Sequence, residues 1–286
     1  MFSVIIPTLN RKNLLKRALL SLRNQTFKNF EVVIVDDMSN DGSYEMIKTF
    51  NDLDLKYIEN CSNGIIAKSR NKGIHASSKN YIAFLDSDDW WKKNKLKITY
   101  DMIKQNNYDF IFHDMHIVAN DRRKKFQFNT KNLRKPFFDS LIMNGNLIFN
   151  SSVVLKKKLL EEINFLNEER QLVSSEDYYA WLSIFKKNPK IKYLNKKLGY
   201  YSIHEGSISK KNMYWSTMMA YRKFISPMGL TEKRKIYSRL NYIKINFKLK
   251  NNLFVKKKYF LYSIVFGHFE IKIKTLYFLI KNLLRI

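Results

Sequence analysis

The first 115 or so residues alternate short apolar runs with segments that keep helical spacing. Residues 2–6 and 30–35 are rich in β-branched and aromatic side chains, whereas residues 14–22 place leucine and alanine on one helical face behind Asn10, a candidate N-cap. The alternation continues with helices expected near 42–50, 65–76 and 93–105 and with strands expected near 54–58, 80–85 and 108–113. Strands that alternate with helices of this length favour βαβ units. The sequence therefore predicts an α/β fold with a mostly parallel central sheet and helices on both faces.

The pattern is mixed between residues 116 and 210. Ile117 and Val118, with residues 126–128, flank the basic run 121–125, which predicts an antiparallel hairpin with that run as its turn. Further elements are expected as a strand at 151–155, a helix at 175–187, and a strand pair at 191–194 and 198–203.

The formal net charge of +27 is unevenly distributed. Residues 210–286 hold 18 lysines and arginines against two acids, Glu232 and Glu270, which is a net charge of +16. Such a charge attracts polyanions, either nucleic acid or the anionic face of a membrane. A chain rich in lysine and asparagine is also typical of AT-rich genomes, which would give part of the excess no function. Because basic and apolar residues interleave here, we expect a domain over 1–210 and a basic, amphipathic helical region over 211–286.

The remaining composition restricts the class of protein. Hydrophobic residues make up 45% of the chain, which is enough for a packed core. The single cysteine, Cys61, excludes an internal disulfide framework and a cysteine-rich metal site, and it suits a reducing cytosol. The first residues lack the basic and apolar segments of a signal peptide, and no stretch approaches the roughly 20 apolar residues that span a bilayer. These features predict a cytoplasmic protein.

A cluster of carboxylates follows one of the expected strands. Asp86, Ser87, Asp88 and Asp89 come directly after the apolar run 81–85, so they are expected at the carboxyl end of a strand, where open α/β sheets bind ligands. Mg²⁺ or Mn²⁺ is usually held by one or two carboxylates together with phosphate oxygens. The alternative is a solvated turn in which Asp89 caps a helix that starts near Trp90. The spacing alone favours neither interpretation.

A second acidic pair, Asp36 and Asp37, ends the expected strand 32–35. A carboxylate at this place can accept a hydrogen bond from the imino N–H of a pyrimidine or from ribose hydroxyls, and the alternative is helix capping by Asn40 or Asp41. Arg70, in the basic segment 68–73, can pair with a phosphate through its planar fork, although a solvated basic helix face is the ordinary alternative.

Several motifs run in a fixed order through residues 3–209. They occupy residues 3–11, 25–27, 30–32, 35–43, 63–64, 67, 70–73, 84–89, 175–178 and 200–209. In this order and spacing they resemble glycosyltransferase family 2, the inverting nucleotide-sugar transferases of GT-A fold. The resemblance implies a Rossmann-like sheet with a nucleotide-binding half over 1–115 and an acceptor-side half over 116–210.

The resemblance also implies roles for residues on the donor side. It places the uracil of a UDP-sugar against Thr8 and Asp37, with Asp36 as their neighbour. It assigns Arg70 to the nucleotide or its phosphates. It assigns Asp86, the first carboxylate of the Asp-x-Asp pair, to the ribose and the sugar.

The other implied roles concern the cation and the catalytic base. Asp88 matches the ligand of a divalent cation, Mn²⁺ or Mg²⁺, that bridges the diphosphate. His204 matches a position near this metal or near the diphosphate. Ser202 stands where many relatives keep an arginine, which weakens the match around His204. Asp177 matches the catalytic base. Supporting positions are Pro7, Asn63, Gly64, Asn71, Asp89, Glu176 and Ser207.

The chemistry of glycosyl transfer is consistent with these roles. The leaving diphosphate gains charge that a divalent cation stabilises, and the attacking hydroxyl needs a carboxylate to take its proton. Asp177 is expected to open a helix, whose macrodipole would favour the ionised carboxylate. The alternative for Glu176 and Asp177 is a pair of first-turn acids without a catalytic role.

The sequence thus predicts a metal-dependent inverting glycosyltransferase that moves a sugar from a nucleotide-sugar, UDP-linked by resemblance, to a hydroxyl of a surface-glycan precursor. Lipopolysaccharide, O-antigen and capsule precursors are the acceptor types that the resemblance implies, some of them lipid-linked. The basic region 211–286 predicts peripheral binding to the anionic inner face of the cell membrane. Two alternatives are a nucleotide-sugar-binding protein without turnover and a basic nucleic-acid-binding protein. We expect no nucleic-acid partner, since no nucleic-acid motif accompanies the charge.

Overall fold

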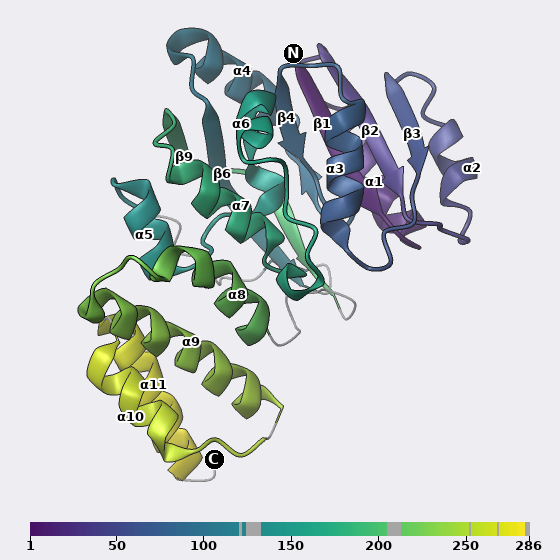
Figure 1. Ribbon diagram of the computed structural model, residues 1–286. Coiled ribbons are helices and arrows are strands. Elements are labelled where there is room, and N and C mark those ends of the chain that lie inside the picture. Colours follow the sequence, from purple (N-terminus) through teal and green to yellow (C-terminus); the bar gives the residue numbers. More distant parts are fainter. Residues whose placement is uncertain (120–121, 124–132, 205–212, 252, 268, 284–286) are drawn as a thin grey trace.

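A computed structural model of the protein describes residues 1–119, 122–123, 133–204, 213–251, 253–267 and 269–283. Within these residues a nine-stranded sheet with the order β3-β2-β1-β4-β8-β6-β9-β5 forms the centre, and β7 pairs with β6 beside that path. Figure 1 shows helices around this sheet and the C-terminal helices below it. The expected α/β fold is confirmed.

The N-terminal half of the sheet is parallel. Its strands are β1 (Phe2–Thr8), β2 (Phe30–Asp36), β3 (Leu55–Glu59) and β4 (Tyr81–Phe84), joined by α1 (Lys12–Arg23), α2 (Ser43–Lys48) and α3 (Ile66–Ala76). Because side chains alternate along a strand, Ile5 packs into one core while Val4 and Ile6 pack into the other. Both cores are apolar, as expected for strands that are covered on two faces.

The C-terminal half of the sheet mixes directions. It contains β5 (Trp90–Trp91), α4 (Lys95–Asn106), β6 (Phe110–Ala119), β7 (Arg122–Arg123), α5 (Phe137–Asn144), a short 3₁₀ turn at Asn150–Ser152, β8 (Val154–Lys156), α6 (Lys157–Glu162), a second 3₁₀ turn at Arg170–Leu172, α7 (Glu176–Phe185) and β9 (Ile191–Ile203). Strand β8 pairs antiparallel with β4 and β6, whereas β6 and β9 are parallel.

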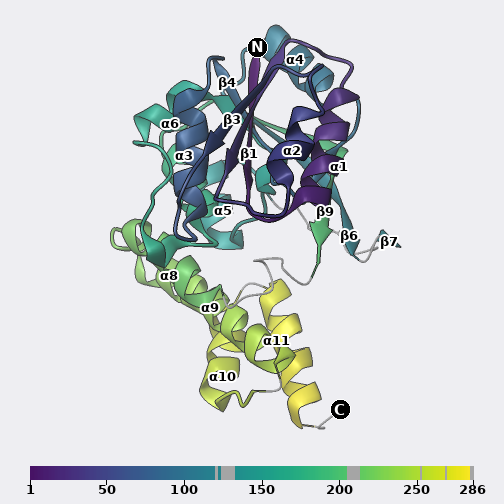
Figure 2. The same ribbon diagram turned by 90° about the vertical axis from the view of Figure 1, so that its right-hand side faces the viewer.

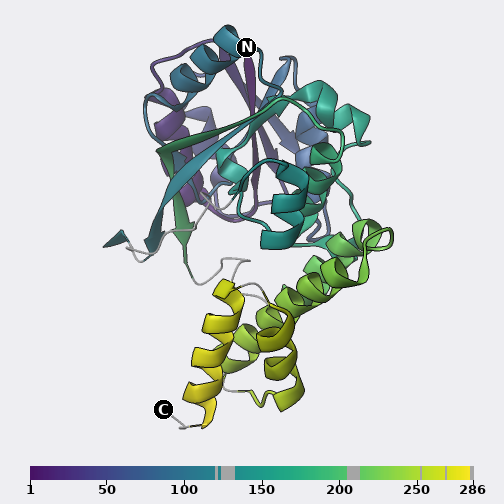
Figure 3. The same ribbon diagram turned by 90° about the vertical axis from the view of Figure 1, so that its left-hand side faces the viewer.

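Helices cover each face of the sheet. Residues of α1, α2 and α4 contribute to the core on one side, and residues of α3 and α5–α8 contribute to the core on the other. Figures 2 and 3, turned from Figure 1 in opposite directions, show these two layers.

Three local predictions are wrong. The basic run 121–125 is not simply a turn, because Arg122 and Arg123 form β7 and pair with Ala119 and Val118. The expected strand 126–128 lies outside the described residues. The strand pair at 191–194 and 198–203 is one strand, β9, because the residues between them are accommodated as a bulge against His113–Met115 of β6. Asn10 is not the N-cap of α1, since its side-chain oxygen accepts a hydrogen bond from the backbone N–H of Asn40 instead.

The C-terminal region is helical, with α8 (Tyr214–Ile225), α9 (Leu230–Lys250), α10 (Lys257–Phe266) and α11 (Phe269–Leu283). Its packing divides within α9. Tyr221 of α8 and Leu240 of α9 belong to the main core, whereas Ile245 of α9 packs in a separate cluster with Val255 and Phe260. We therefore propose that the structural division falls within α9, later than the residue 210 expected from composition.

Candidate active site

The site lies where parallel strands end. Thr8 is opposite Asp36 in the β1–β2 register, and the backbone N–H of Asp37 donates to the carbonyl oxygen of Thr8. Strand β4 lies on the other side of β1, and Asp86–Asp89 follow its end. The three segments therefore reach the same edge of the sheet, because parallel strands present their carboxyl ends together.

Asp88 is held between basic side chains. Its Oδ2 lies 2.9 Å from Nε2 of His204 and 3.1 Å from Nη1 of Arg11, and its backbone carbonyl accepts a hydrogen bond from Arg17 at 2.7 Å. The structure therefore brings His204 to Asp88 across a separation of 116 residues, as the sequence predicted for two groups near one cation.

Arg70 joins the donor-side acids to the start of α7. Its Nη2 donates to Oδ1 of Asp86 at 2.7 Å, and its Nη1 donates to Oε1 of Glu176 at 2.5 Å. Arg70 is 3% exposed, and although burial lowers the pKa of its guanidinium, the carboxylates of Asp86 and Glu176 outweigh this and raise it. Its fork is thus directed at two protein carboxylates, whereas the sequence predicted a contact with nucleotide or phosphate.

Asp177 is the neighbour of this ion pair. Burial, together with the adjacent Glu176, raises the pKa of Asp177 to about 7, against the opposing charge of Arg70. Its Oδ1 accepts a hydrogen bond from the backbone N–H of Tyr178 at 2.6 Å, and its Oδ2 accepts one from Nδ2 of Asn146 at 3.2 Å. The helix macrodipole, expected to favour the ionised carboxylate, is outweighed here by desolvation and a neighbouring acid.

Two other residues fix the position of Asp86. Nδ2 of Asn150 donates to Oδ1 of Asp86 at 3.1 Å, and the backbone N–H of Asp86 donates to Oγ of Ser151 at 3.0 Å. Both partners come from the 3₁₀ turn before β8. This turn therefore supports Asp86 from the antiparallel half of the sheet.

Asp89 does not cap a helix. Residues 90–91 form β5 and α4 begins only at Lys95, so no helix starts beside it. Asp89 is fully buried, and its Oδ1 accepts a hydrogen bond from the backbone N–H of Ser202 in β9. Burial and the neighbouring carboxylates of Asp88 and Asp86 raise its pKa well above the usual range. Asp89 thus connects the loop that contains Asp86 and Asp88 to β9, the strand that precedes His204.

The acids after β2 are engaged with their own loops. Asp36 accepts hydrogen bonds from the backbone and hydroxyl of Ser39 and from the hydroxyl of Tyr57. Both carboxylate oxygens of Asp37 accept hydrogen bonds from Ser62, one from its N–H and one from its hydroxyl. The predicted cap, Asp41, binds the backbone N–H groups at the starts of α1 and α2.

Thr8 offers a free polar atom at this edge. Its Oγ1 is buried and has no hydrogen-bond partner among the described residues, although Thr8 ends β1 next to Asp36. A buried hydroxyl usually has a partner, so this atom is suited to a ligand. Pro7 precedes it in β1, opposite Val35.

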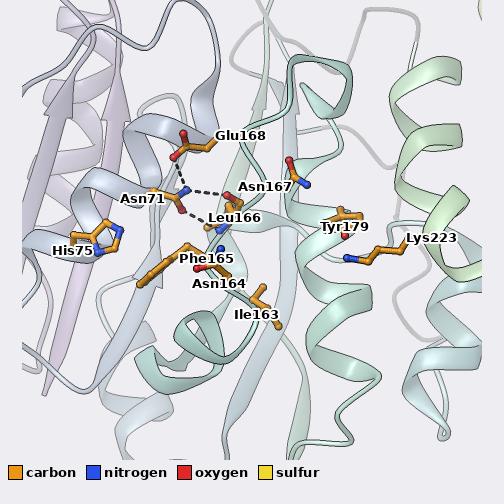
Figure 4. A pocket seen from close by; sticks show the side chains of 10 residues that line it. All are labelled: Asn71, His75, Ile163, Asn164, Phe165, Leu166, Asn167, Glu168, Tyr179 and Lys223. Carbon is orange, nitrogen blue, oxygen red and sulfur yellow. Dashed lines mark hydrogen bonds between the residues drawn. The ribbon is translucent and has the colours of Figure 1, made fainter.

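Asn71 borders a cavity between α3, the loop 163–168 and α7. Asn71 holds the loop 166–168 through both backbone groups of Leu166 and the carboxylate of Glu168. Figure 4 shows these side chains around a cavity of about 520 Å³ that also meets His75, Tyr179 and Lys223. Neither Asp86 nor Asp88 lines it, so Asn71 supports the scaffold behind the site.

The remaining supporting positions are placed as follows. Asn63 and Gly64 both have positive φ angles, 54° and 78°, and form a left-handed turn after Ser62. The carbonyl of Asn63 accepts a hydrogen bond from Arg170. Ser207 lies outside the described residues.

The residues around Asp88 fit a divalent cation. Asp88 Oδ2 and His204 Nε2 point at each other from 2.9 Å, so one ion could take both an oxygen and a nitrogen ligand there. Among the described residues no group of three or more histidines, cysteines or acids could hold a metal by itself. Such a site would depend on phosphate oxygens, as is usual for Mg²⁺.

Some site residues were not predicted. Arg11 belongs to the first motif, and Arg17, Asn146, Asn150 and Ser151 had no assigned role. Each reaches the site from a segment far away in the chain, so helical or strand spacing gives no signal for it. Arg11 in the first motif was the one available signal, since a cation near a cluster of carboxylates is electrostatically favourable.

Comparisons with known proteins identify the family to which this chain is similar. A family model described as glycosyl transferase family 2 matches residues 3–163. The glycosyltransferase GlyA of Streptococcus pneumoniae serotype 4 is 32% identical over 223 residues, which cover 73% of this chain but 31% of GlyA, so the chain spans about a third of that relative.

Two further proteins match along most of their length. UDP-Glc:alpha-D-GlcNAc-diphosphoundecaprenol beta-1,3-glucosyltransferase WfgD of Escherichia coli is 30% identical over 254 residues, which cover 86% of this chain and 93% of WfgD. The crystal structure of S. aureus TarS 1–349 in complex with UDP-GlcNAc is similar with a TM-score of 0.68 and 25% identity, covering 92% of this chain and 78% of that one. This likeness confirms the expected GT-A fold.

Proposed function

The chain belongs to glycosyl transferase family 2 and is a glycosyltransferase, and on that premise we propose that it transfers a sugar from UDP to a hydroxyl of a surface-glycan precursor with inversion at the anomeric carbon. The observation that carries the proposal is the chain of contacts from Asp86 through Arg70 to Glu176, beside Asp177 with a pKa near 7. A donor-side carboxylate and a candidate base are thereby fixed relative to each other.

Asp177 is suited to act as the general base. A base works best when its pKa is near the working pH, and the value of about 7 meets this condition. Its Oδ2, held by Asn146, would take the proton of the acceptor hydroxyl as that oxygen bonds to the anomeric carbon. The bond from this carbon to the diphosphate oxygen breaks in the same step, and the electron pair leaves with UDP.

The donor side would bind and orient UDP. Oγ1 of Thr8 is available for a hydrogen bond with the uracil of UDP. Asp37 lies beside Thr8, and its carboxylate is fixed by Ser62. Asp86, fixed by Arg70 and Asn150, would accept hydrogen bonds from hydroxyls of the ribose or the sugar.

Asp88 and His204 would hold the divalent cation. When bound, Mn²⁺ or Mg²⁺ neutralises the negative charge of the leaving diphosphate. Arg11 and Arg17, which contact Asp88, add fixed positive charge at the same place. Anion binding is thus supported by this chain's own residues.

The relatives support the choice of substrates. WfgD is named for UDP-glucose and a diphosphoundecaprenol-linked acceptor, and TarS was solved with UDP-GlcNAc. We therefore propose a UDP-sugar donor and a saccharide acceptor on a lipid diphosphate, and action at the inner face of the cell membrane.

Two alternatives make different predictions. A nucleotide-sugar-binding protein without turnover would bind UDP-sugar but release no UDP. For a nucleic-acid-binding protein, the affinity for nucleic acid would fall steeply as the salt concentration rises, and substitutions at Asp86 and Asp88 would not change it.

The test is a panel of nucleotide-sugars incubated with the protein and Mn²⁺, with and without lipid-diphosphate-linked acceptors, and scored by release of nucleoside diphosphate. We expect release from one UDP-sugar above all others, and an inverted anomeric configuration in the product by NMR. Tight binding without release from any donor would contradict the proposal.

A further inference from the structure

Exposed apolar side chains are concentrated at the C-terminal end of the molecule. Of the sixteen large apolar side chains that the described residues leave exposed, twelve lie beyond residue 213. Single exposed apolar residues are ordinary on a protein surface, but a concentration of them marks an interaction site.

Helix α11 carries four of these residues in one stripe. Phe269, Ile273, Leu276 and Ile280 are exposed and follow one another at intervals of four, three and four residues, which places them on one helical face. Ile271 is buried on a different face, where the helix packs on its neighbours. The helix therefore has more apolar surface than its packing within the described residues covers.

The loop from α9 to α10 adds an apolar tip with positive charge. Leu253 and Phe254 are exposed, Phe254 by 77%, and the exposed lysines Lys256, Lys257 and Lys258 follow after the buried Val255. Apolar side chains flanked by lysines suit the boundary between lipid headgroups and acyl chains.

The charge of the region selects the partner. Residues 210–286 carry a net charge of +16 with two acids. A second copy of this chain would bring two such surfaces together, which like-charge repulsion opposes. An anionic lipid surface would instead gain from every lysine within its field.

We propose that α10, α11 and the loop before α10 form a docking face for an anionic phospholipid bilayer. The apolar stripe of α11 enters the interface and the lysines bind headgroup phosphates. The helices lie on the bilayer, because none among the described residues is both long and apolar enough to pass through one.

Docking would orient the active site. Figures 2 and 3 show that β9, which precedes His204, ends on the side of the sheet that faces the C-terminal helices. A bilayer bound to these helices would therefore lie nearer to the sheet edge that carries the candidate active site than to the opposite edge. This consequence rests on the proposed lipid-linked acceptor, whereas the docking face itself does not.

The experiment measures binding of the full-length protein to vesicles of phosphatidylcholine with or without phosphatidylglycerol, by co-sedimentation without donor or acceptor. We expect binding only with phosphatidylglycerol, and weakening at high salt. Ile273→Glu with Leu276→Glu should reduce the partition coefficient by about tenfold or more. Lys256→Glu with Lys257→Glu should do the same.

Matched controls come from α1, far from the C-terminal helices. Leu20→Glu and Lys16→Glu make the same chemical changes at exposed positions and should leave vesicle binding unchanged. UDP release during sugar transfer to a soluble acceptor separates the two proposals. Variants of the apolar stripe should keep this activity while their binding to vesicles is lost. Equal binding by stripe variants and controls would overturn the docking face.

A second measurement remains informative if the stripe variants fold poorly. Cys61 is the one cysteine in the chain and is exposed. In a Cys61→Ser background, Ile273→Cys is labelled with an environment-sensitive fluorophore. Its emission maximum should shift to shorter wavelength when anionic vesicles are added, whereas the emission of labelled Leu20→Cys should not shift. A shift that depends on protein concentration instead of lipid would show that a second copy covers the stripe and would overturn the proposal.

Discussion

Two carboxylates of the site, Asp88 and Asp177, lie in opposite electrostatic surroundings. Asp88 contacts two basic side chains, those of Arg11 and His204. Asp177 accepts hydrogen bonds from an amide and a backbone N–H, whereas Arg70 donates its hydrogen bonds to Asp86 and Glu176. The comparison shows how one acidic network can hold a carboxylate that pairs with basic side chains and another whose pKa is raised to about 7.

Asp177→Asn is expected to have the largest effect. The amide keeps the shape but cannot accept the acceptor's proton, so turnover should fall by about 10²–10⁴-fold. Affinity for UDP should remain close to that of the wild type. Initial rates and UDP titration by calorimetry measure the two quantities.

Asp139→Asn is the matched control, because Asp139 is also a first-turn acid, in α5, but is exposed. It should keep full activity. A wild-type rate in Asp177→Asn would assign the base to another residue.

Asp88→Ala should lower Mn²⁺-dependent UDP release by about a thousandfold, since a bound cation contributes several kcal/mol to stabilising the leaving group. UDP affinity should also stop responding to Mn²⁺. Asp101→Ala, which removes a surface partner of Lys97, should change neither quantity. Retained Mn²⁺ dependence in Asp88→Ala would show that the cation is held elsewhere.

Arg70→Met should lower the free energy of unfolding by about 3–5 kcal/mol, because it leaves the paired carboxylates without their cation. Urea denaturation measures this change. Arg23→Met removes the exposed pair with Asp52 and should lower the free energy of unfolding far less than Arg70→Met, because solvent screens a surface ion pair. Equal costs for the two variants would mean that the Arg70 bridge contributes no more than a surface ion pair.

Asn146→Ala should have the smallest effect, on the pH dependence. Asp177 must be ionised to act as base, so kcat/KM should rise with pH through about 7. Removing the hydrogen bond to the carboxylate raises its pKa and should move this rise upward by a few tenths of a unit. Asn144→Ala, in the same segment but bound to Ser140, should leave the profile unchanged.

The pKa of Asp177 also affects stability, with a defined sign. Because folding raises its pKa from the ordinary value of 3.8 to about 7, the folded state binds the proton more tightly than the unfolded state. Its contribution to stability therefore falls as pH rises between these two values. Asp177→Asn should remove that fall, which thermal melts over the same pH range can detect.

The sequence predicted the parallel half of the sheet well because its information is local. Strands such as β2 and β4 are continuous apolar runs, and the helices between them keep regular spacing. The antiparallel half was predicted less well. A bulge keeps β9 continuous, and β5 lies where one of the two alternatives for Asp89 placed the start of a helix. Both features depend on pairing with distant strands.

The sequence alone determined which carboxylates end strands β2 and β4, that Glu176 and Asp177 open a helix, and that positive charge gathers after residue 210, since each is a property of neighbouring residues. Only the tertiary structure decided that Arg70 bridges Asp86 and Glu176 and that Asp177 is left to titrate near neutral pH. A pKa depends on burial and on charges within a few ångströms, and those neighbours come from segments about a hundred residues apart in the chain.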